Sequence, residues 1–245
     1  MKKLFVSLLS CLLFVGISVN AYGFGFKKNN NHQRPDVGIY ASELAGTDSY
    51  YVGSDEKVIY LTFDAGYDNG NLIKILDILD RKNVLSTFFV TGDFLERNSD
   101  LAKEIDTRGH IVGNHTYHHK NITKISEDSL RNEVKLLEDK YRSLTNKEMV
   151  KVFRPPEGQF NKASLTVLKD MGYKTFFWSI AYDDWNTKSQ KGGDYGYKKV
   201  MDNLHNGAII LMHTVSSDNV ECLERVIDDA RSQGYEFRNL NNFQG

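Results

Sequence analysis

Residues 58–70 read VIYLTFDAGYDNG, and this stretch carries the strongest indication of the fold. An apolar run from Val58 to Phe63 is typical of a buried strand, and it ends directly at the carboxylate of Asp64. Glycines follow, and the next segment has the apolar spacing of a helix. Parallel α/β proteins keep their chemistry at the carboxyl ends of their strands. Asp64 is therefore a candidate functional residue, and its partners should come from the ends of neighbouring strands.

From Lys57 onward, strand-like apolar runs alternate with helical segments. The predicted strands cover residues 58–63, 86–91, 110–113, 150–153, 175–180, 208–212 and 236–240, and the predicted helices cover residues 72–82, 99–108, 126–144, 162–171, 195–204 and 219–233. Such alternation predicts an α/β fold with a mostly parallel sheet, and seven strands favour a barrel slightly short of the usual eight. An open, doubly wound sheet is the alternative, since alternation alone does not show closure.

The first 21 residues have the pattern of a secretory signal peptide. Lys2 and Lys3 precede an apolar run over residues 4–19, and cleavage is expected after Ala21, where small or medium residues stand at the positions that a signal peptidase reads. An uncleaved membrane anchor is the less favoured alternative, because the apolar run is shorter than the roughly 20 residues of a spanning helix. The sequence therefore predicts an exported protein.

The rest of the chain is expected to form one domain over residues 57–245, since 245 residues with 40% hydrophobic content suffice for one substantial core. Residues 22–56 are predicted to be a linker and N-terminal extension, with a flexible tether over residues 22–38. Removal of the signal peptide leaves Cys222 as the single cysteine, which indicates a core residue and no internal disulfide. It also removes two lysines, which changes the formal net charge from −1 to −3 and argues against a nucleic-acid partner.

A cluster of histidines follows the third predicted strand, in the stretch NHTYHH (residues 114–119). A spacing of four places His115 and His119 on one face of a helical turn, where two imidazoles can bind one divalent metal. His118 is three residues from His115, so the spacing does not exclude it as a ligand. A polar surface turn is the alternative, and for this stretch alone it would be the commoner outcome.

Three further strand ends carry residues suited to chemistry. After the fourth strand, the prolines and glycine of RPPEG (residues 154–158) predict a rigid loop that presents Arg154 in one place. The fifth strand leads to Asp184 and Trp185, and the sixth ends at His213. Each has an ordinary structural interpretation, as a strand stop, a helix cap with a packed indole, or a core histidine. Five such features at the same end of successive strands instead favour one common site.

These features read TFDAG (residues 62–66), HTYHH (115–119), RPPEG (154–158), DW (184–185) and LMH (211–213). In order and spacing they resemble the five motifs of the polysaccharide deacetylases, the NodB homology family of carbohydrate esterase family 4. The resemblance covers about residues 56–240. It implies a distorted (β/α)7 barrel and metal-dependent hydrolysis of an acetyl group on a glycan.

Longer matches narrow the resemblance to one branch of the family. They read TFDAGYDNG (residues 62–70), TFFVTG (87–92), GHIVGNH (109–115), FWS (177–179) and LMHTVSSDN (211–219). This branch deacetylates N-acetylmuramic acid in peptidoglycan during sporulation and takes part in making the muramic-δ-lactam of the spore cortex. The resemblance therefore implies an enzyme that works on the cell wall or spore envelope.

The resemblance also implies a role for each matched residue. Asp64 would be the general base that takes a proton from the attacking water, and Arg154 would hold it ionised. His213 would protonate the leaving amine, and Asp184 would orient its ring. The residues expected to contact substrate are Tyr67, Pro155, Pro156, Trp185 and Leu211.

Ala65 departs from the family pattern, which has a second aspartate there as a metal ligand. The resemblance implies a divalent metal on His115 and His119, Zn²⁺ or else Mn²⁺, Co²⁺ or Mg²⁺, bound weakly because alanine has no donor atom. Three hypotheses follow: a metal recruited with the substrate, a substitute ligand such as Asp68 or Asn69, or an inactive site. The first is favoured, because the base, the acid and the partners of both are present.

The expected partner is the glycan strand of peptidoglycan, after an amidase has removed its peptides, and the protein is expected to be a monomer. Two other functions stay open. One is a deacetylase for N-acetylglucosamine or chitin-type substrates on the same scaffold. The other is a catalytically silent glycan-binding protein that cannot hold its metal.

Overall fold

The computed structural model describes residues 22–25 and 31–245. In this part of the chain the strands are β1 (Tyr22–Gly23), β2 (Ser49–Tyr50), β3 (Val58–Ala65), β4 (Thr87–Val90), β5 (Ile111–Asn114), β6 (Val152–Phe153), β7 (Gln159–Phe160), β8 (Lys174–Phe176), β9 (Ala208–His213) and β10 (Glu236–Phe237). All seven predicted strands are therefore confirmed, although several are shorter than predicted.

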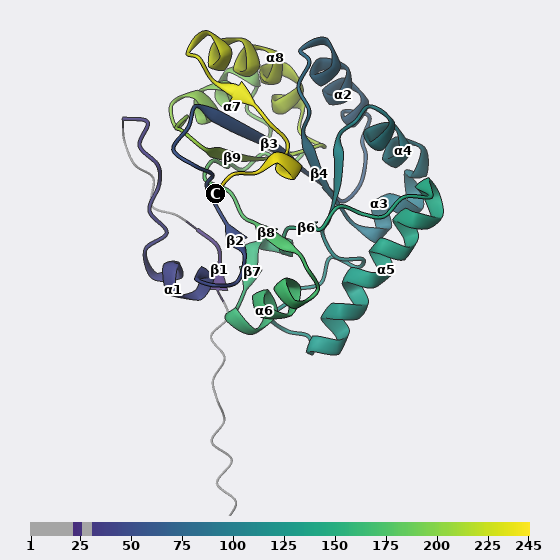
Figure 1. The fold of residues 1–245 in the computed structure, drawn as a ribbon. Coiled ribbons are helices and arrows are strands. Elements are labelled where there is room, and N and C mark those ends of the chain that lie inside the picture. The colour runs from purple at the N-terminus through teal and green to yellow at the C-terminus, as the bar shows by residue number, and fades with distance from the viewer. Residues whose placement is uncertain (1–21, 26–30) are drawn as a thin grey trace, which may run out of the picture.

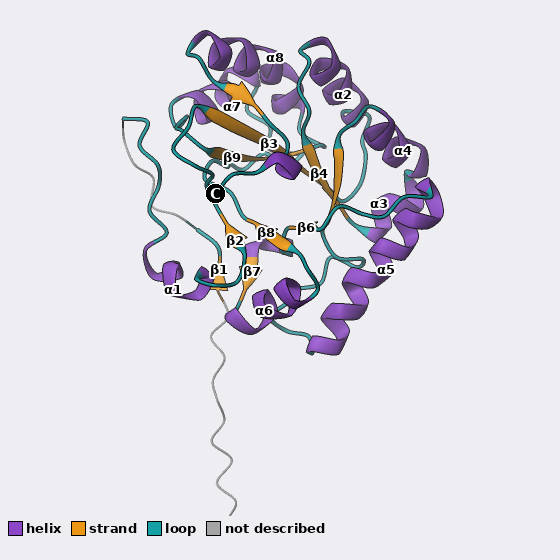
Figure 2. Cartoon of the chain, in the orientation of Figure 1, coloured by secondary structure: helices purple, strands orange, loops and turns teal. Residues whose placement is uncertain are grey.

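The α-helices of the described residues are α1 (Ala41–Leu44), α2 (Leu72–Arg81), α3 (Gly92–Arg97), α4 (Ser99–Thr107), α5 (Glu127–Thr145), α6 (Lys162–Asp170), α7 (Gly193–Met201) and α8 (Ser217–Ser232). Single 3₁₀ turns cover Gly38–Tyr40, Pro156–Gly158 and Leu240–Asn242. The six predicted helices are confirmed, and α3 is an additional short helix that begins after the N-cap Thr91. Figure 2 shows the helices arranged around the strands.

The central sheet is mostly parallel and curls around the middle of the molecule (Figure 1). β3 pairs with β9 on one side and β4 on the other, and the sheet continues through β5, β6, β8 and β2, while β10 pairs with the start of β3. Beyond β8, Ile180 forms a parallel bridge with Ile210 of β9, and the N–H of Ser179 donates to the carbonyl of Ile209. The chain after β8 thus returns to β9. This confirms the distorted barrel and excludes the open doubly wound sheet.

The strand register brings the predicted functional residues to one edge of the sheet. Asp64 of β3 is the pairing partner of His213 in β9. On the other side, Asn114 ends β5 directly before the histidine stretch and pairs with Phe153 of β6, which directly precedes Arg154. Parallel strands that end together place their following residues at one rim, so residues separated by up to 150 positions in sequence become neighbours.

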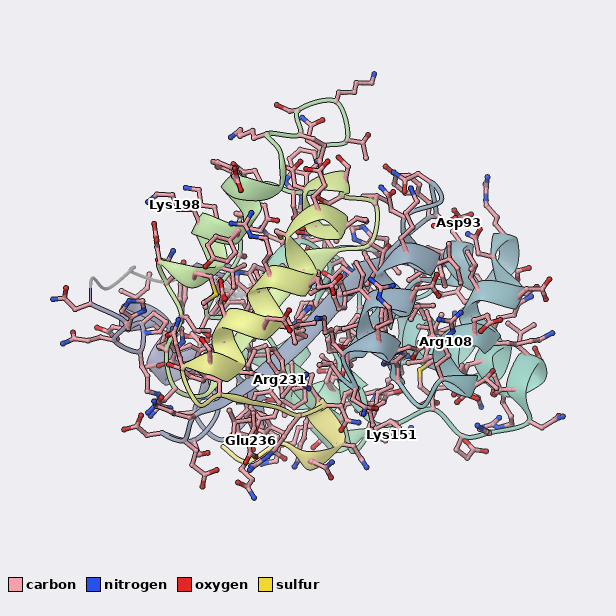
Figure 3. The ribbon with its side chains drawn as sticks, turned by 90° about the horizontal axis from the view of Figure 1, so that it is seen from above. Asp93, Arg108, Lys151, Lys198, Arg231 and Glu236 are labelled. Carbon is pink, nitrogen blue, oxygen red and sulfur yellow. The ribbon has the colours of Figure 1, made fainter. Side chains whose placement is uncertain are left out.

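The helices cover the sheet with apolar stripes and turn charged side chains outward, as with Lys198 in Figure 3. α5 begins at the N-cap Ser126, whose hydroxyl accepts the N–H of Ser129, and ends at Asn146 in the left-handed conformation. Its buried stripe has helical spacing and includes one charged residue among Leu130, Glu133, Val134, Leu137 and Tyr141. In α8, Cys222 is fully buried and free, and burial raises the pKa of its thiol to about 12. Cys222 is thus an inert core residue, as predicted.

The N-terminal extension packs on the barrel in its described part, which corrects the prediction of a flexible tether. Residues Tyr22–Gly23 pair with β7 in antiparallel fashion. The buried ring of Phe24 stacks on Phe177 with 4.4 Å between ring centroids. Aromatic residues alternate with glycine over residues 22–26, which read YGFGF, and this short period-two pattern was the available signal for a strand. A buried aromatic ring such as that of Phe24 removes enough apolar area from water to hold the segment on the barrel. The predicted signal peptide lies outside the described residues. Among the described residues, no helix is long and apolar enough to span a membrane.

Candidate active site

A cavity of about 1050 Å³ opens at the rim where the strands end. Most of the predicted site residues line it, namely Asp64, Tyr67, His115, His119, Trp185, Leu211 and His213. Arg154 and Asp184 lie directly behind the lining and are fully buried. Pro155 and Pro156 are also buried and do not line the cavity, whereas the following residues of their loop, Glu157 and Gly158, do.

Asp64 does not cap a helix, because it lies within β3 and its carboxylate pairs with Arg154. Nη1 of Arg154 donates to Oδ1 of Asp64 at 2.9 Å. Burial on its own would raise the pKa of Asp64, but the charge of Arg154 and the neighbouring imidazoles of His115 and His213 lower it below its usual value. Asp64 is thus held as an ionised carboxylate facing the cavity.

Arg154 is aimed by a set of oxygen acceptors around a fully buried guanidinium. Besides Asp64, its Nη2 donates to Oγ1 of Thr62 at 2.7 Å and to the carbonyl of Phe177 at 3.1 Å, and its Nε donates to the carbonyl of Phe176 at 3.2 Å. The ring of Phe89 lies 4.3 Å from the guanidinium carbon. A planar group with donors in several directions is needed to satisfy this set, which explains arginine rather than lysine here.

His213 and Asp184 form a second pair at the same rim. Nδ1 of His213 donates to Oδ1 of Asp184 at 2.7 Å, and the backbone N–H of His213 donates to Oδ2 at 2.7 Å. Burial lowers the pKa of His213, but the hydrogen bond and charge of Asp184 outweigh it, so the pKa is raised above its usual value. His213 is therefore neither an isolated core histidine nor a surface one, but a cavity-facing imidazole that favours its protonated form.

The histidine stretch approaches the cavity as an irregular loop, so the predicted helical turn is wrong. The strand ends at Asn114, whose side-chain oxygen accepts the N–H of Thr116 at 3.0 Å. Thr116 and His119 have positive φ values of 62° and 52°, which an α-helix does not allow. The loop still brings the rings of His115 and His119 to a centroid distance of 5.0 Å. The proximity of His115 and His119 was therefore predicted correctly, but the backbone conformation that brings them together was not.

These two histidines fit a divalent cation. Nδ1 of His115 lies 2.8 Å from the carbonyl of Arg154, which can only accept, so Nδ1 carries the proton and Nε2 keeps its lone pair on the side of Asp64, 3.6 Å from Oδ2. Burial lowers the pKa of His115 to about 4, although the charge of Asp64 opposes this, so the ring is a neutral imidazole as metal binding requires.

Within the part of the chain that the structure describes, no third protein ligand accompanies them. Ala65 is fully buried in the apolar core. Asp68 accepts the N–H groups of Gly70 and Leu72, and Asn69 donates to the carbonyl of Val215. Neither lines the cavity, so neither replaces the missing aspartate. Across residues 22–25 and 31–245, no group of three or more His, Cys, Asp or Glu side chains is arranged to hold a metal.

His118 also lines the cavity, and its ring bonds to Glu133, a residue that the sequence did not single out. Glu133 of α5 is almost fully buried and accepts from the backbone N–H of His118 at 2.8 Å, from its Nδ1 at 2.9 Å and from Nζ of Lys120 at 2.8 Å. These contacts fix the loop between His115 and His119. The sequence signal that could have indicated the role of Glu133 was the presence of a charged residue within the apolar stripe of α5.

Aromatic rings form the rim of the cavity. Trp185 is 59% exposed and Tyr67 is 48% exposed, so the indole is not packed in the core as its ordinary interpretation would require. Trp178 and Tyr182 also line the cavity. Glu157 adds a carboxylate at the rim and has a positive φ of 57°, a conformation that costs a non-glycine residue energy. Such a rim is suited to a sugar, whose faces pack on rings while its hydroxyls bond to polar groups.

The family model for polysaccharide deacetylases matches residues 52–176. The peptidoglycan-N-acetylmuramic acid deacetylase PdaA of Bacillus subtilis is 42% identical over 221 residues, which cover 89% of this chain and 84% of PdaA. The chain belongs to the polysaccharide deacetylase family. The solved structure of PdaA, a family 4 carbohydrate esterase, matches with a TM-score of 0.88 and 41% identity over 91% of this chain and 96% of the PdaA chain.

Other members of the polysaccharide deacetylase family differ in what they are said to do. A peptidoglycan-N-acetylglucosamine deacetylase of Bacillus cereus is 33% identical over 200 residues, which cover 80% of this chain and 92% of that protein. A Bacillus anthracis structure described as a pseudoenzyme of the family matches with a TM-score of 0.74 and 31% identity over 79% of this chain and 67% of that chain. Membership makes the chain a polysaccharide deacetylase by class, a hydrolase of amide-linked acetyl groups.

Proposed function

We propose that this protein is an exported hydrolase that removes the acetyl group of N-acetylmuramic acid in peptidoglycan, on the route to the muramic-δ-lactam of the spore cortex. One observation carries the proposal: two buried ion pairs, Asp64 with Arg154 and His213 with Asp184, meet at one cavity. The chain that holds them is 42% identical to a deacetylase of this substrate. The predicted signal peptide supports export.

Hydrolysis of an amide needs a base for water and an acid for the leaving nitrogen. Asp64, ionised by Arg154, accepts one proton as the water oxygen bonds to the acetyl carbon. His213, protonated beside Asp184, gives its proton to the nitrogen as the C–N bond breaks. The products are acetate and a free amine, and the register of β3 with β9 places base and acid on neighbouring strands.

A divalent cation on His115 and His119 would polarise the acetyl carbonyl and make the attacking water more acidic. The chain itself supplies the orientation. Trp185 and Tyr67 present ring faces at the rim for the sugar, and Leu211 offers an apolar contact for the acetyl methyl group.

The test is incubation of the purified chain with peptidoglycan, with and without prior amidase treatment, in Zn²⁺, Mn²⁺, Mg²⁺ or Co²⁺. Mass spectrometry of the muropeptides should find muramic residues without acetyl groups only after amidase treatment. Asp64→Asn and His213→Ala should abolish the release of acetate. Unchanged muramic residues under all conditions would reject the proposed substrate.

Lactam formation requires a second step, in which the freed amine attacks the lactyl carboxyl of the same sugar, so that a C–N bond forms, a C–O bond of the carboxyl group breaks and water is released. This step needs a muramic acid without its peptide, which is why an amidase should act first. The cyclisation part of the proposal fails if peptide-free strands release acetate but yield only the free muramic amine.

A deacetylase for N-acetylglucosamine or chitin is the alternative within the family, and the Bacillus cereus relative supports it. Acetate release from chitin oligomers, but not from peptide-stripped peptidoglycan, would favour this alternative. The silent glycan-binding protein is supported by the two-histidine site beside Ala65 and by the relative described as a pseudoenzyme. Glycan binding without acetate release in any of the four metals would favour it.

A further inference from the structure

A buried polar network lies behind the pair of His213 and Asp184. Asn219, in the first turn of α8, is fully buried. Its Nδ2 donates to Oδ2 of Asp184 at 2.6 Å and to the backbone carbonyl of His213 at 3.0 Å. Both protons of the amide group are therefore used on the two residues of the pair, and none is left for a role in holding other parts of the fold.

Tyr182 fixes the orientation of this amide. Its hydroxyl is hydrogen-bonded to Oδ1 of Asn219, which leaves Nδ2 facing Asp184. Burial raises the pKa of Tyr182, so the hydroxyl stays protonated and can donate to the amide oxygen. The hydroxyl itself is confined by α7, because a Cβ at Gly196 would lie 2.6 Å from its oxygen. The amide thus has one satisfactory orientation.

We propose that Asn219 is the positioning residue of the general acid, and that Tyr182 sets the direction in which its amide donates. Asp184 is fully buried, and its oxygens accept from Nδ1 and the backbone N–H of His213 and from Asn219. Without Asn219, Oδ2 of Asp184 loses one of its two hydrogen-bond donors. A buried carboxylate with too few donors is destabilised, and its side chain is expected to move toward other donors. The ring of His213 then loses the partner that orients it.

The titratable groups around the pair come from several elements. They are Asp64 of β3, Arg154 after β6, Tyr182 after β8, and Asp218 and Cys222 of α8. Asp218 is already engaged by the backbone N–H groups of Lys191 and Gly192. Asn219 is thus the side chain through which α8 bonds to Asp184.

Two nearly isosteric variants separate positioning from packing. Asn219→Leu keeps the volume and removes the donor at every pH. Asn219→Asp keeps the shape but sets a carboxylate against Asp184, so it can donate only while it carries a proton, at low pH. Val226→Ala is the matched control, because Val226 is fully buried in α8 seven residues further on and has no polar group that could bond to Asp184 or Tyr182.

The first readout does not need substrate. A proton held between Nδ1 of His213 and Asp184 gives a far-downfield ¹H NMR signal, which His213→Gln assigns by removing it. We expect the signal in the wild type and in Val226→Ala, and a weakened or absent signal in Asn219→Leu. In Asn219→Asp, the signal should be present at low pH and lost as pH rises. An unchanged signal in both Asn219 variants would overturn the proposal.

The second readout rests on the proposed function. Deacetylation by Asn219→Leu should fall about 10- to 100-fold in kcat with little change in KM, the usual range for residues that orient a catalytic group. Activity of Asn219→Asp relative to wild type should rise as pH falls, whereas a packing defect would give a deficit independent of pH. If the wild type releases no acetate, the proposed function fails, and the NMR signal alone decides the role of Asn219.

Discussion

Replacement of Arg154 by methionine is the sharpest test of the site. The change removes a fully buried guanidinium, and its four acceptors then lose their common donor. These acceptors are the carboxylate of Asp64, the hydroxyl of Thr62 and the carbonyls of Phe176 and Phe177. Methionine is close to the aliphatic part of arginine in shape, whereas the contact of the guanidinium with the ring of Phe89 is lost together with the charge. The loss measured is therefore mainly that of charge and hydrogen bonds.

The expected cost is large because Asp64 would remain as an unpaired buried charge. Breaking a buried ion pair by removing one partner costs about 3–5 kcal/mol, whereas loss of surface pairs costs about 1 kcal/mol or less. Arg108 offers the matched control, since it bonds to Asp77, Asp80 and Glu104 on the outside of the barrel. Arg108→Met should therefore destabilise the protein much less than Arg154→Met.

The assay is urea unfolding of both variants, of Asp64→Asn and of the double variant Asp64→Asn/Arg154→Met. The double variant should be more stable than the sum of the single effects predicts, since it removes both charges together. Arg154→Met should also raise the pKa of Asp64, because burial raises it and the opposing charge is gone. If the variant keeps some activity, the acid limb of its pH profile should therefore lie at higher pH than that of the wild type. Equal costs for Arg154→Met and Arg108→Met, with no coupling in the double variant, would refute this account of the pair.

Two further predictions concern the acid and the metal. In the proposed mechanism His213 acts while protonated, so activity should fall as pH rises through its raised pKa. Asp184→Asn removes the charge that raises this pKa and should move the basic limb of the kcat/KM profile to lower pH, and an unmoved limb would contradict the proposed role. His115→Ala and His119→Ala should each weaken Zn²⁺ binding about 10-fold or more in calorimetry, whereas His118→Ala should leave it unchanged. Equal losses in all three variants would mean that His118 is a ligand after all.

Local patterns in the sequence predicted the regular elements of the fold. The strand from Val58 was found because it is a continuous apolar run, and the long α5 helix because its apolar residues recur with the 3.6-residue period of a helix. Their common rim followed from the rule that parallel strands end together, and that rule was enough to gather Asp64 and His213 from sequence alone. Helix α3 was missed, since six residues are too few to establish a period.

The contacts that orient the site could not be predicted in the same way. Glu133 reaches His118 across 15 positions and Asn219 reaches Asp184 across 35, and no local pattern encodes a side-chain contact at such separations. The backbone of the histidine loop was predicted wrongly. A spacing of four between histidines is compatible with a helix, and it does not reveal that Thr116 adopts a left-handed backbone conformation. The candidate reacting groups could therefore be predicted from the sequence, whereas the structure was needed to find the groups that hold them.

The free-energy cost of burying the two ion pairs bears on whether the site is active. A buried ion pair is a poor source of stability, and apolar residues of similar volume often serve a fold equally well or better. Yet this chain buries Arg154 and Asp184 completely and satisfies them with Thr62, Asn219 and several backbone groups. Stability alone gives no reason for two such pairs to face one cavity. A silent binding protein would need the aromatic rim but neither pair, so their presence beside Ala65 favours a working acid and base over a site that has lost its chemistry.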